Sequence, residues 1–223
     1  MDLINIYQKL YRFFGPQYWW PGETPFEISV GAILTQNTNW GNVEKAINNL
    51  KKQNALSAKA IHEMPVKKLS ELIRPAGYFN IKAKRLKSFI NFLMNDYNGS
   101  MKRMKKDDVH SLRKKLLSIN GIGPETADSI LLYAHEKTIF VIDAYTKRVL
   151  SRHGIMEHDG PYDKFQELFH SSLGKDVKLF NEYHALFVRV GKTYCKRKKP
   201  LCDGCPLNVF SNSTILKSVS LMH

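Results

Sequence analysis

The chain has 223 residues, 43% of them hydrophobic, which suits one large or two small globular domains and excludes a disordered protein. No run approaches the roughly 18 apolar residues of a membrane span, and the amphipathic N-terminus lacks the apolar core of a secretory signal, so we expect a soluble, intracellular protein. Lys and Arg outnumber Asp and Glu by 34 to 20, and the net charge of +14 favours a polyanionic partner, most commonly nucleic acid.

The basic residues gather in four clusters: KAKRLK (82–87), KRMKK (102–106), LRKKL (112–116) and KRKK (196–199). Any single cluster could simply be a solvated helix face. Four clusters in a chain of this charge favour DNA or RNA as the partner.

Most of the chain predicts helices. Apolar residues recur at helical spacing in the segments 26–34, 43–50, 87–97, 109–117, 125–134, 145–153, 162–173 and 176–192. The stretches FEISVGAIL (26–34) and TIFVID (138–143) could instead be short strands, but no hairpin signals accompany them.

A Gly-Ile-Gly turn separates two of the predicted helices. Gly121 and Gly123 bracket Ile122, and Pro124 suits the first turn of the helix that follows. Backbone N–H groups at such a helix start can bind a DNA phosphate without reading a base. A lone Gly-x-Gly is equally typical of an ordinary helix–turn–helix.

Asp143 stands between the apolar run TIFVI and the next helical pattern. This placement predicts a helix N-cap, which by itself is a structural role.

Together, these segments resemble the helix–hairpin–helix DNA glycosylases of the endonuclease III superfamily. GIGPETADSILLYA (121–134) followed by VIDAYTKRVLSR (141–152) carries the resemblance, and three further segments extend it over nearly the whole chain: ILTQNTNWGNVEKAI (33–47), RPAGYFNIKAKRLK (74–87) and GKTYCKRKKPLCDGCPLNVFS (191–211). The resemblance implies an all-α fold with two helical domains flanking a DNA-binding cleft. A six-helix domain with the hairpin would cover 22–133, and residues 1–21 plus 134–223 would form the second domain.

The resemblance also implies the catalytic residues. Asp143 would face the cleft, stabilise the positive charge that develops on the deoxyribose, and orient a water. Relatives with lyase activity carry a lysine in the hairpin that forms a Schiff base, and Glu125 stands at that position here. A glutamate cannot form a Schiff base, so we expect base excision by water. Glu125 could be catalytic or simply a first-turn acid favoured by the helix dipole.

Glu125 and several aromatic residues are similar to the endonuclease III-like 3-methyladenine DNA glycosylases. An aromatic pocket attracts a flat cationic purine by stacking and cation–π interaction, and the lesion's own charge already weakens the bond to be cut. The resemblance implies these pocket candidates: Trp40, Trp20, Trp19, Pro21 and Lys192. For each tryptophan, packing in the core or at an interface is the alternative.

DNA contacts are also expected from the resemblance. Gln36 matches the glutamine that fills the hole left by the flipped base, and Tyr78 matches the wedge that stacks on the opposite base, although Tyr78 could instead be buried packing. The remaining candidate contacts are Asn80, Lys82, Gly121, Gly123, Thr126 and Lys147; Lys147 could also belong to a solvated helix face.

Three cysteines lie together in Cys195-x6-Cys202-x2-Cys205, which argues against a disulfide framework and for a local metal or cluster site. The spacing resembles the first three ligands of the superfamily's [4Fe–4S] loop, whose fourth position is Ser211 here. Ser211 could ligate the fourth iron, that iron could be labile or solvent-bound, or the cluster could be lost. Zinc is a further alternative, which the spacing disfavours.

The sequence therefore predicts a monofunctional DNA glycosylase of base excision repair that acts on alkylated purines such as 3-methyladenine. The partner is double-stranded DNA carrying a damaged base, and we expect a cytoplasmic, nucleoid-associated monomer with no membrane partner. The alternatives are a glycosylase/lyase for oxidised pyrimidines, a mismatch glycosylase, and a lesion-binding protein without catalysis.

Overall fold

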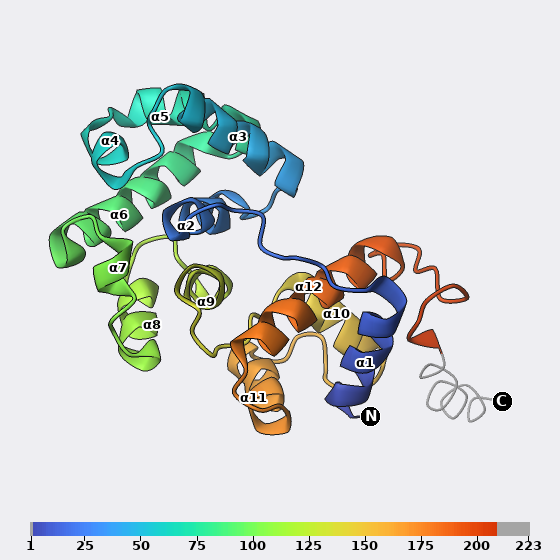
Figure 1. Cartoon of the computed structure of the whole chain (residues 1–223). Coiled ribbons are helices and arrows are strands. Elements are labelled where there is room, and N and C mark those ends of the chain that lie inside the picture. The colour runs from blue at the N-terminus through green and yellow to red at the C-terminus, as the bar shows by residue number, and fades with distance from the viewer. Residues whose placement is uncertain (1, 209–223) are drawn as a thin grey trace. The chain divides into compact units, whose positions relative to one another are not determined.

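The computed structural model describes residues 2–208, and in this range the elements are all helices joined by turns and irregular segments, with no strand (Figure 1). The all-α prediction is confirmed. None of the helices in this range is long and apolar enough to cross a membrane. By its internal contacts the chain divides into two compact units, which we call the hairpin unit (residues 21–137) and the terminal unit (residues up to 20 together with those from 138 onward).

The hairpin unit contains eight α-helices, a 3₁₀ turn and a π-helical turn. In chain order these are α2 (Pro25–Leu34), α3 (Trp40–Lys52), α4 (Ala58–Glu63), α5 (Val66–Leu72), η1 (Arg74–Ala76), α6 (Phe79–Tyr97), α7 (Met101–Met104), α8 (Val109–Leu117), α9 (Pro124–Ser129) and η2 (Ile130–Ala134). The expected number was six. The short helices α4, α5 and α7 were not predicted because a helix of four to seven residues shows too few turns to reveal its period.

The described part of the terminal unit contains four helices. These are α1 (Leu3–Phe14), α10 (Ala144–Arg152), α11 (Tyr162–Ser172) and α12 (Val177–Thr193). Its core is aromatic: the rings of Phe140 and Phe169 stack at 3.7 Å, and those of Tyr183 and Phe187 stack at 4.8 Å. Helix α12 lies against α1 and α10 and contributes more buried residues to this core than any other helix of the unit.

Side-chain caps set many of the helix starts. The side chains of Thr24, Asn39, Asp108 and Asp143 each accept a hydrogen bond from an amide in the first turn of the helix that follows. Such caps satisfy backbone donors that have no partner within the helix. The N-cap predicted for Asp143 is therefore present.

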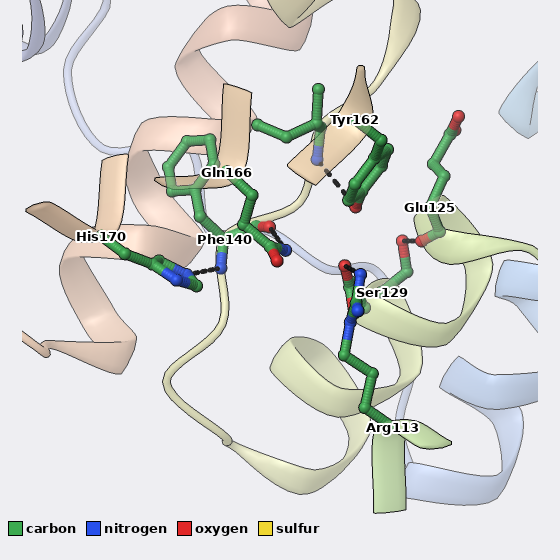
Figure 2. Close-up of polar contacts among 9 residues, drawn as sticks. Arg113, Glu125, Ser129, Phe140, Tyr162, Gln166 and His170 are labelled. Carbon is green, nitrogen blue, oxygen red and sulfur yellow. Dashed lines mark hydrogen bonds and ion pairs between the residues drawn. The ribbon is translucent and has the colours of Figure 1, made fainter. Parts of the chain in front are cut away.

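The stretch TIFVID (138–143) is extended but forms no strand, because side chains of α11 take its backbone hydrogen bonds. Phe140 N–H donates to His170 Nε2 at 3.0 Å, and Gln166 Nε2 donates to the Phe140 carbonyl at 2.7 Å (Figure 2). The Tyr162 hydroxyl accepts from Ile142 N–H at 3.2 Å. These three side chains recur at intervals of four residues along one face of α11. The helix thereby replaces the partner strand that the apolar run would otherwise need.

A buried ion pair joins the two helices of the hairpin. Arg113 of α8 holds Asp128 of α9 through two bonds, Nε to Oδ1 at 2.7 Å and Nη2 to Oδ2 at 3.1 Å (Figure 2). The Asp128 side chain is fully buried and that of Arg113 is one-fifth exposed. Bidentate geometry of this kind fixes the angle between two elements as well as their distance.

We expect Arg113→Gln to destabilise the hairpin unit by about 3 kcal/mol, because removing one partner of a buried pair leaves the other charge poorly compensated in the interior. Chemical denaturation monitored by circular dichroism measures the loss. Lys114→Gln is the matched control, since Lys114 lies next to Arg113 but is exposed, and we expect a change within about 0.5 kcal/mol. Equal losses in the two variants would contradict this role for the pair.

Candidate DNA-binding and catalytic site

The two glycines of the turn between α8 and α9 differ in their surroundings, and only Gly121 is required by the fold. Gly121 has φ +87°, and a Cβ added to it would lie 2.2 Å from Cγ of Arg85, so neither the backbone conformation nor the space admits another residue. A Cβ on Gly123 would meet nothing within 4 Å, so that side of the turn is open. Ile122 points inward and is 4% exposed. The turn therefore presents bare backbone at its surface.

Gln36 binds the hairpin directly. Its Nε2 donates to the Gly121 carbonyl at 3.0 Å and to Thr126 Oγ1 at 2.9 Å, and its Oε1 accepts from Nη1 of Arg85. Two motifs that lie 85 residues apart in the sequence thus form one network in the hairpin unit. Its role as the glutamine that fills the vacated base position stays a prediction.

Arg85 is a residue of this network that the sequence did not predict. In the sequence it is one of several basic residues of the KAKRLK cluster, but in the structure it packs against Gly121 and bonds Gln36. Nothing in the local sequence distinguishes Arg85 from its exposed neighbour Lys84, because both partners of Arg85 are distant in the chain.

Tyr78 is 68% exposed and adopts the left-handed conformation, with φ +46°, immediately before α6. This exposure excludes the alternative of buried packing. Ile81, one turn further along α6, is 52% exposed, and Asn80 is also at the surface. The hairpin unit therefore exposes two large hydrophobic side chains, those of Tyr78 and Ile81, at the expected wedge position.

The expectation that Lys82 contacts a DNA phosphate is wrong. Its side chain is 1% exposed, and its ammonium donates to the carbonyls of Leu34 at 2.8 Å and Ala76 at 2.7 Å. Burial, with a smaller effect of Arg85, lowers the pKa of Lys82 to about 8. Lys82 therefore holds α2 and η1 against α6. The sequence did not predict this role, because Lys82 stands among other basic residues in one cluster.

Asp143 is the buried acid of the terminal unit, with a residue exposure of 8%. Its Oδ1 accepts from Thr146 N–H at 2.7 Å, and its Oδ2 lies 3.5 Å from Nε2 of His184 on α12. Burial alone would raise the pKa of this carboxyl, but His184 and Thr146 outweigh it and the pKa is lowered. The carboxylate is thus held in its charged form.

Lys147 is half-buried, and its own unit engages its ammonium. Nζ donates to the Gly160 carbonyl at 2.7 Å and lies 4.9 Å from the centroid of the Phe165 ring. A phosphate contact would compete with both interactions. The phosphate contact stays a prediction, and these contacts argue against the alternative of a freely solvated helix face.

The structure brings three of the five pocket candidates together in the terminal unit. The rings of Trp19 and Trp20 meet edge to face at 5.5 Å, and Nζ of Lys192 lies 5.8 Å from the centroid of the Trp19 ring. Trp40 begins α3 and, like Pro21, belongs to the hairpin unit. The Trp19 ring already attracts a cation, the property expected of the pocket.

The three cysteines line one cavity of about 210 Å³ in the terminal unit, among mostly apolar side chains such as Val149, Val190, Leu201 and Leu207. Arg152 also borders it, and its Nη1 lies 3.4 Å from Sγ of Cys195. Arg152 bonds the carbonyls of Lys196 and Arg197, so it anchors the exposed KRKK segment. Among residues 2–208, no three His, Cys, Asp or Glu side chains form a group that could hold a metal ion. Ser211 lies outside the described residues.

Comparison with known proteins identifies relatives along nearly the whole chain. Residues 30–175 match the family described as HhH-GPD superfamily base excision DNA repair protein. The chain is 51% identical over 209 residues to a Methanocaldococcus jannaschii protein provisionally named a DNA repair glycosylase, covering 93% of this chain and 94% of that protein. It is 30% identical over 181 residues to endonuclease III of Sulfolobus acidocaldarius, covering 81% of this chain and 78% of that enzyme.

Solved structures agree with these matches. The crystal structure of H. pylori 3-methyladenine DNA glycosylase bound to 1,N6-ethenoadenine is similar with a TM-score of 0.75 and 31% identity, covering 86% of this chain and 98% of that one. A non-covalent endonuclease III–DNA complex has a TM-score of 0.80 at 20% identity, covering 94% and 95% of the two chains, and supports the fold alone.

Proposed function

Because the chain belongs to the HhH-GPD superfamily and is a DNA glycosylase of base excision repair, we propose that it hydrolyses the N-glycosidic bond of alkylated purines, including 3-methyladenine, and leaves an abasic site uncut. The observation that best supports this substrate class is the 31% identity, over 86% of the chain, to a 3-methyladenine glycosylase. Its substrate would be a damaged base in double-stranded DNA.

The chemistry proposed for Asp143 follows from its charge. Breaking the glycosidic bond builds positive charge on the deoxyribose, and an ionised carboxylate stabilises that charge and orients the attacking water. The lowered pKa of Asp143 supports this role, because a neutral acid could not supply the negative charge.

The proposed pocket uses the tryptophan pair. The edge-to-face pair of Trp19 and Trp20 would supply the aromatic lining, and Lys192 lies over Trp19. A methylated purine is cationic and leaves easily, so the enzyme needs little acid catalysis for it. Trp40 and Pro21 stay predicted pocket residues.

The proposed DNA contacts lie in the hairpin unit. Gly123 and the start of α9 would approach a phosphate, Tyr78 would stack on the base opposite the lesion with Asn80 beside it, and Gln36 would fill the hole left by the flipped base. Gln36, Gly121 and Thr126 form the network behind this surface. Phosphate contacts of this kind bind without reading sequence.

Cys195, Cys202 and Cys205 line one cavity, although their side chains as placed do not form a group that could hold a metal ion. Burial raises the pKa of the Cys205 thiol, and the charges of the Cys195 and Cys202 thiolates raise it further by repulsion. Cationic iron would relieve that repulsion. We propose that these three thiolates hold the cluster in a structural role, and that Ser211 or solvent completes it.

The proposed function is tested by incubating the protein with methylated duplex DNA and with DNA containing an oxidised pyrimidine. We expect release of free 3-methyladenine and no strand nicking of either substrate, measured by chromatography of the released base and by denaturing electrophoresis. Nicking of the oxidised substrate would instead favour a glycosylase/lyase. Tight lesion binding without release of any base would favour a non-catalytic protein.

A further inference from the structure

His184 lies against the carboxylate that the proposed function assigns to catalysis. Its Nε2 is 3.5 Å from Oδ2 of Asp143, and the side chains are 5% and 10% exposed. The other carboxylate oxygen is already engaged by Thr146. The two oxygens thus have separate partners, one from α10 and one from α12.

The position of His184 is fixed by packing. It lies in the middle of α12, and its ring meets the Phe140 ring edge-on at 6.4 Å. Phe140 is in turn held by Gln166 and His170 of α11. The imidazole therefore cannot move away from Asp143 without disturbing the aromatic core.

An imidazole at this place counters the cost of burying a charge. A carboxylate removed from water is strongly disfavoured unless positive potential faces it. An imidazolium supplies that potential, and so does a neutral ring that carries its proton on Nε2. Among the described residues, no salt bridge other than that with His184 is present at Asp143.

We propose that His184 is the positioning residue of the glycosylase site: it holds Oδ2 of Asp143 and keeps this carboxylate ionised, so that excision continues in mildly acidic solution. The proposal rests on the proposed role of Asp143.

Other titratable groups surround Asp143 in the terminal unit. Tyr162 of α11 accepts a hydrogen bond from the amide of Ile142, the residue before Asp143. Tyr145 of α10 has a pKa raised by burial and then by the Asp143 charge. A phenol carries no positive charge in either protonation state, so neither tyrosine can offset the carboxylate charge as an imidazole ring can.

Two substitutions separate a polar role from a packing role. His184→Gln keeps an N–H donor near the position of Nε2 but loses the ring, whereas His184→Phe keeps the ring and loses the donor. We measure single-turnover release of 3-methyladenine from methylated DNA as a function of pH. We expect the acid limb of the profile to stay in place for His184→Gln and to move to higher pH by about one unit or more for His184→Phe.

The opposite order would overturn the proposal: a normal profile for His184→Phe and a damaged enzyme for His184→Gln would assign His184 to packing. His158→Phe is the control for loss of a histidine, since His158 is exposed in the loop before α11, and it should leave the profile unchanged.

A second measurement does not depend on the substrate. Carbon-13 NMR of protein labelled at the aspartate carboxyls follows each titration, and Asp143→Asn identifies the signal of residue 143. We expect Asp143 to titrate at higher pH in His184→Phe than in the unmodified protein, and equal titrations would overturn the proposal. If the unmodified protein releases no alkylated base, the proposed function fails. This titration would still show whether His184 keeps the Asp143 carboxylate ionised.

Discussion

Asp143→Asn is expected to reduce release of alkylated purines by about 10²- to 10³-fold or more while leaving the fold and DNA binding in place. Asparagine removes the negative charge that would stabilise the oxocarbenium-like sugar. It retains an Oδ1 that can accept from Thr146 N–H, so the cap of α10 survives. Affinity for lesion DNA should be unchanged or higher. Single-turnover release and fluorescence anisotropy on the same duplex measure the two quantities.

The terminal unit offers a matched control for this change. Asp176 is also an N-cap aspartate, accepting from the amides of Lys178 and Leu179 at the start of α12, and its contacts lie at the surface. We expect Asp176→Asn to release base at nearly the normal rate. If Asp143→Asn still excises the base at a normal rate, the proposed catalytic role of the Asp143 carboxylate is contradicted, whatever the control shows.

The sequence predicted the parts of the site that are local in the chain. The cap at Asp143 and the turn at Gly121 each depend on a few neighbouring residues, and their residue types signal them. Tyr78 was singled out by the resemblance instead; its side chain is exposed, and its wedge role stays a prediction. The all-α fold followed from apolar periodicity in the same way.

The sequence could not predict the contacts that join distant segments. Lys82 and Arg85 sit in one basic cluster, yet Lys82 is buried on two carbonyls and Arg85 bonds Gln36. His184 shows no motif at all. Lys82 bonds Leu34 and Arg85 bonds Gln36, 48 and 49 residues away, and His184 lies against Asp143, about 40 residues away, so only the packed structure distinguishes a buried cation or imidazole from a solvated one.

Glu125→Lys is expected to convert the protein from one that forms no covalent DNA intermediate into one that borohydride traps on DNA. The unmodified protein should give no trapped complex, because residue 125 lacks an amine to attack the sugar carbon. Glu125 is exposed in the first turn of α9, so the hairpin should accept a lysine at a cost of a few tenths of a kcal/mol from the helix dipole. Electrophoresis of borohydride-treated reactions on methylated or abasic DNA detects the complex.

The control is a lysine placed elsewhere in the same turn. Asn120 is exposed and precedes Gly121, so Asn120→Lys adds the same amine and charge at a different position and should trap little or nothing. Trapping by Glu125→Lys alone would identify residue 125 as the position whose chemistry separates hydrolysis from lyase activity. Trapping by the unmodified protein would mean that another lysine is the nucleophile, and the monofunctional proposal would fall. A failure of both variants to trap would show that residue 125 does not reach the sugar, and Glu125 could then no longer explain an uncut abasic site.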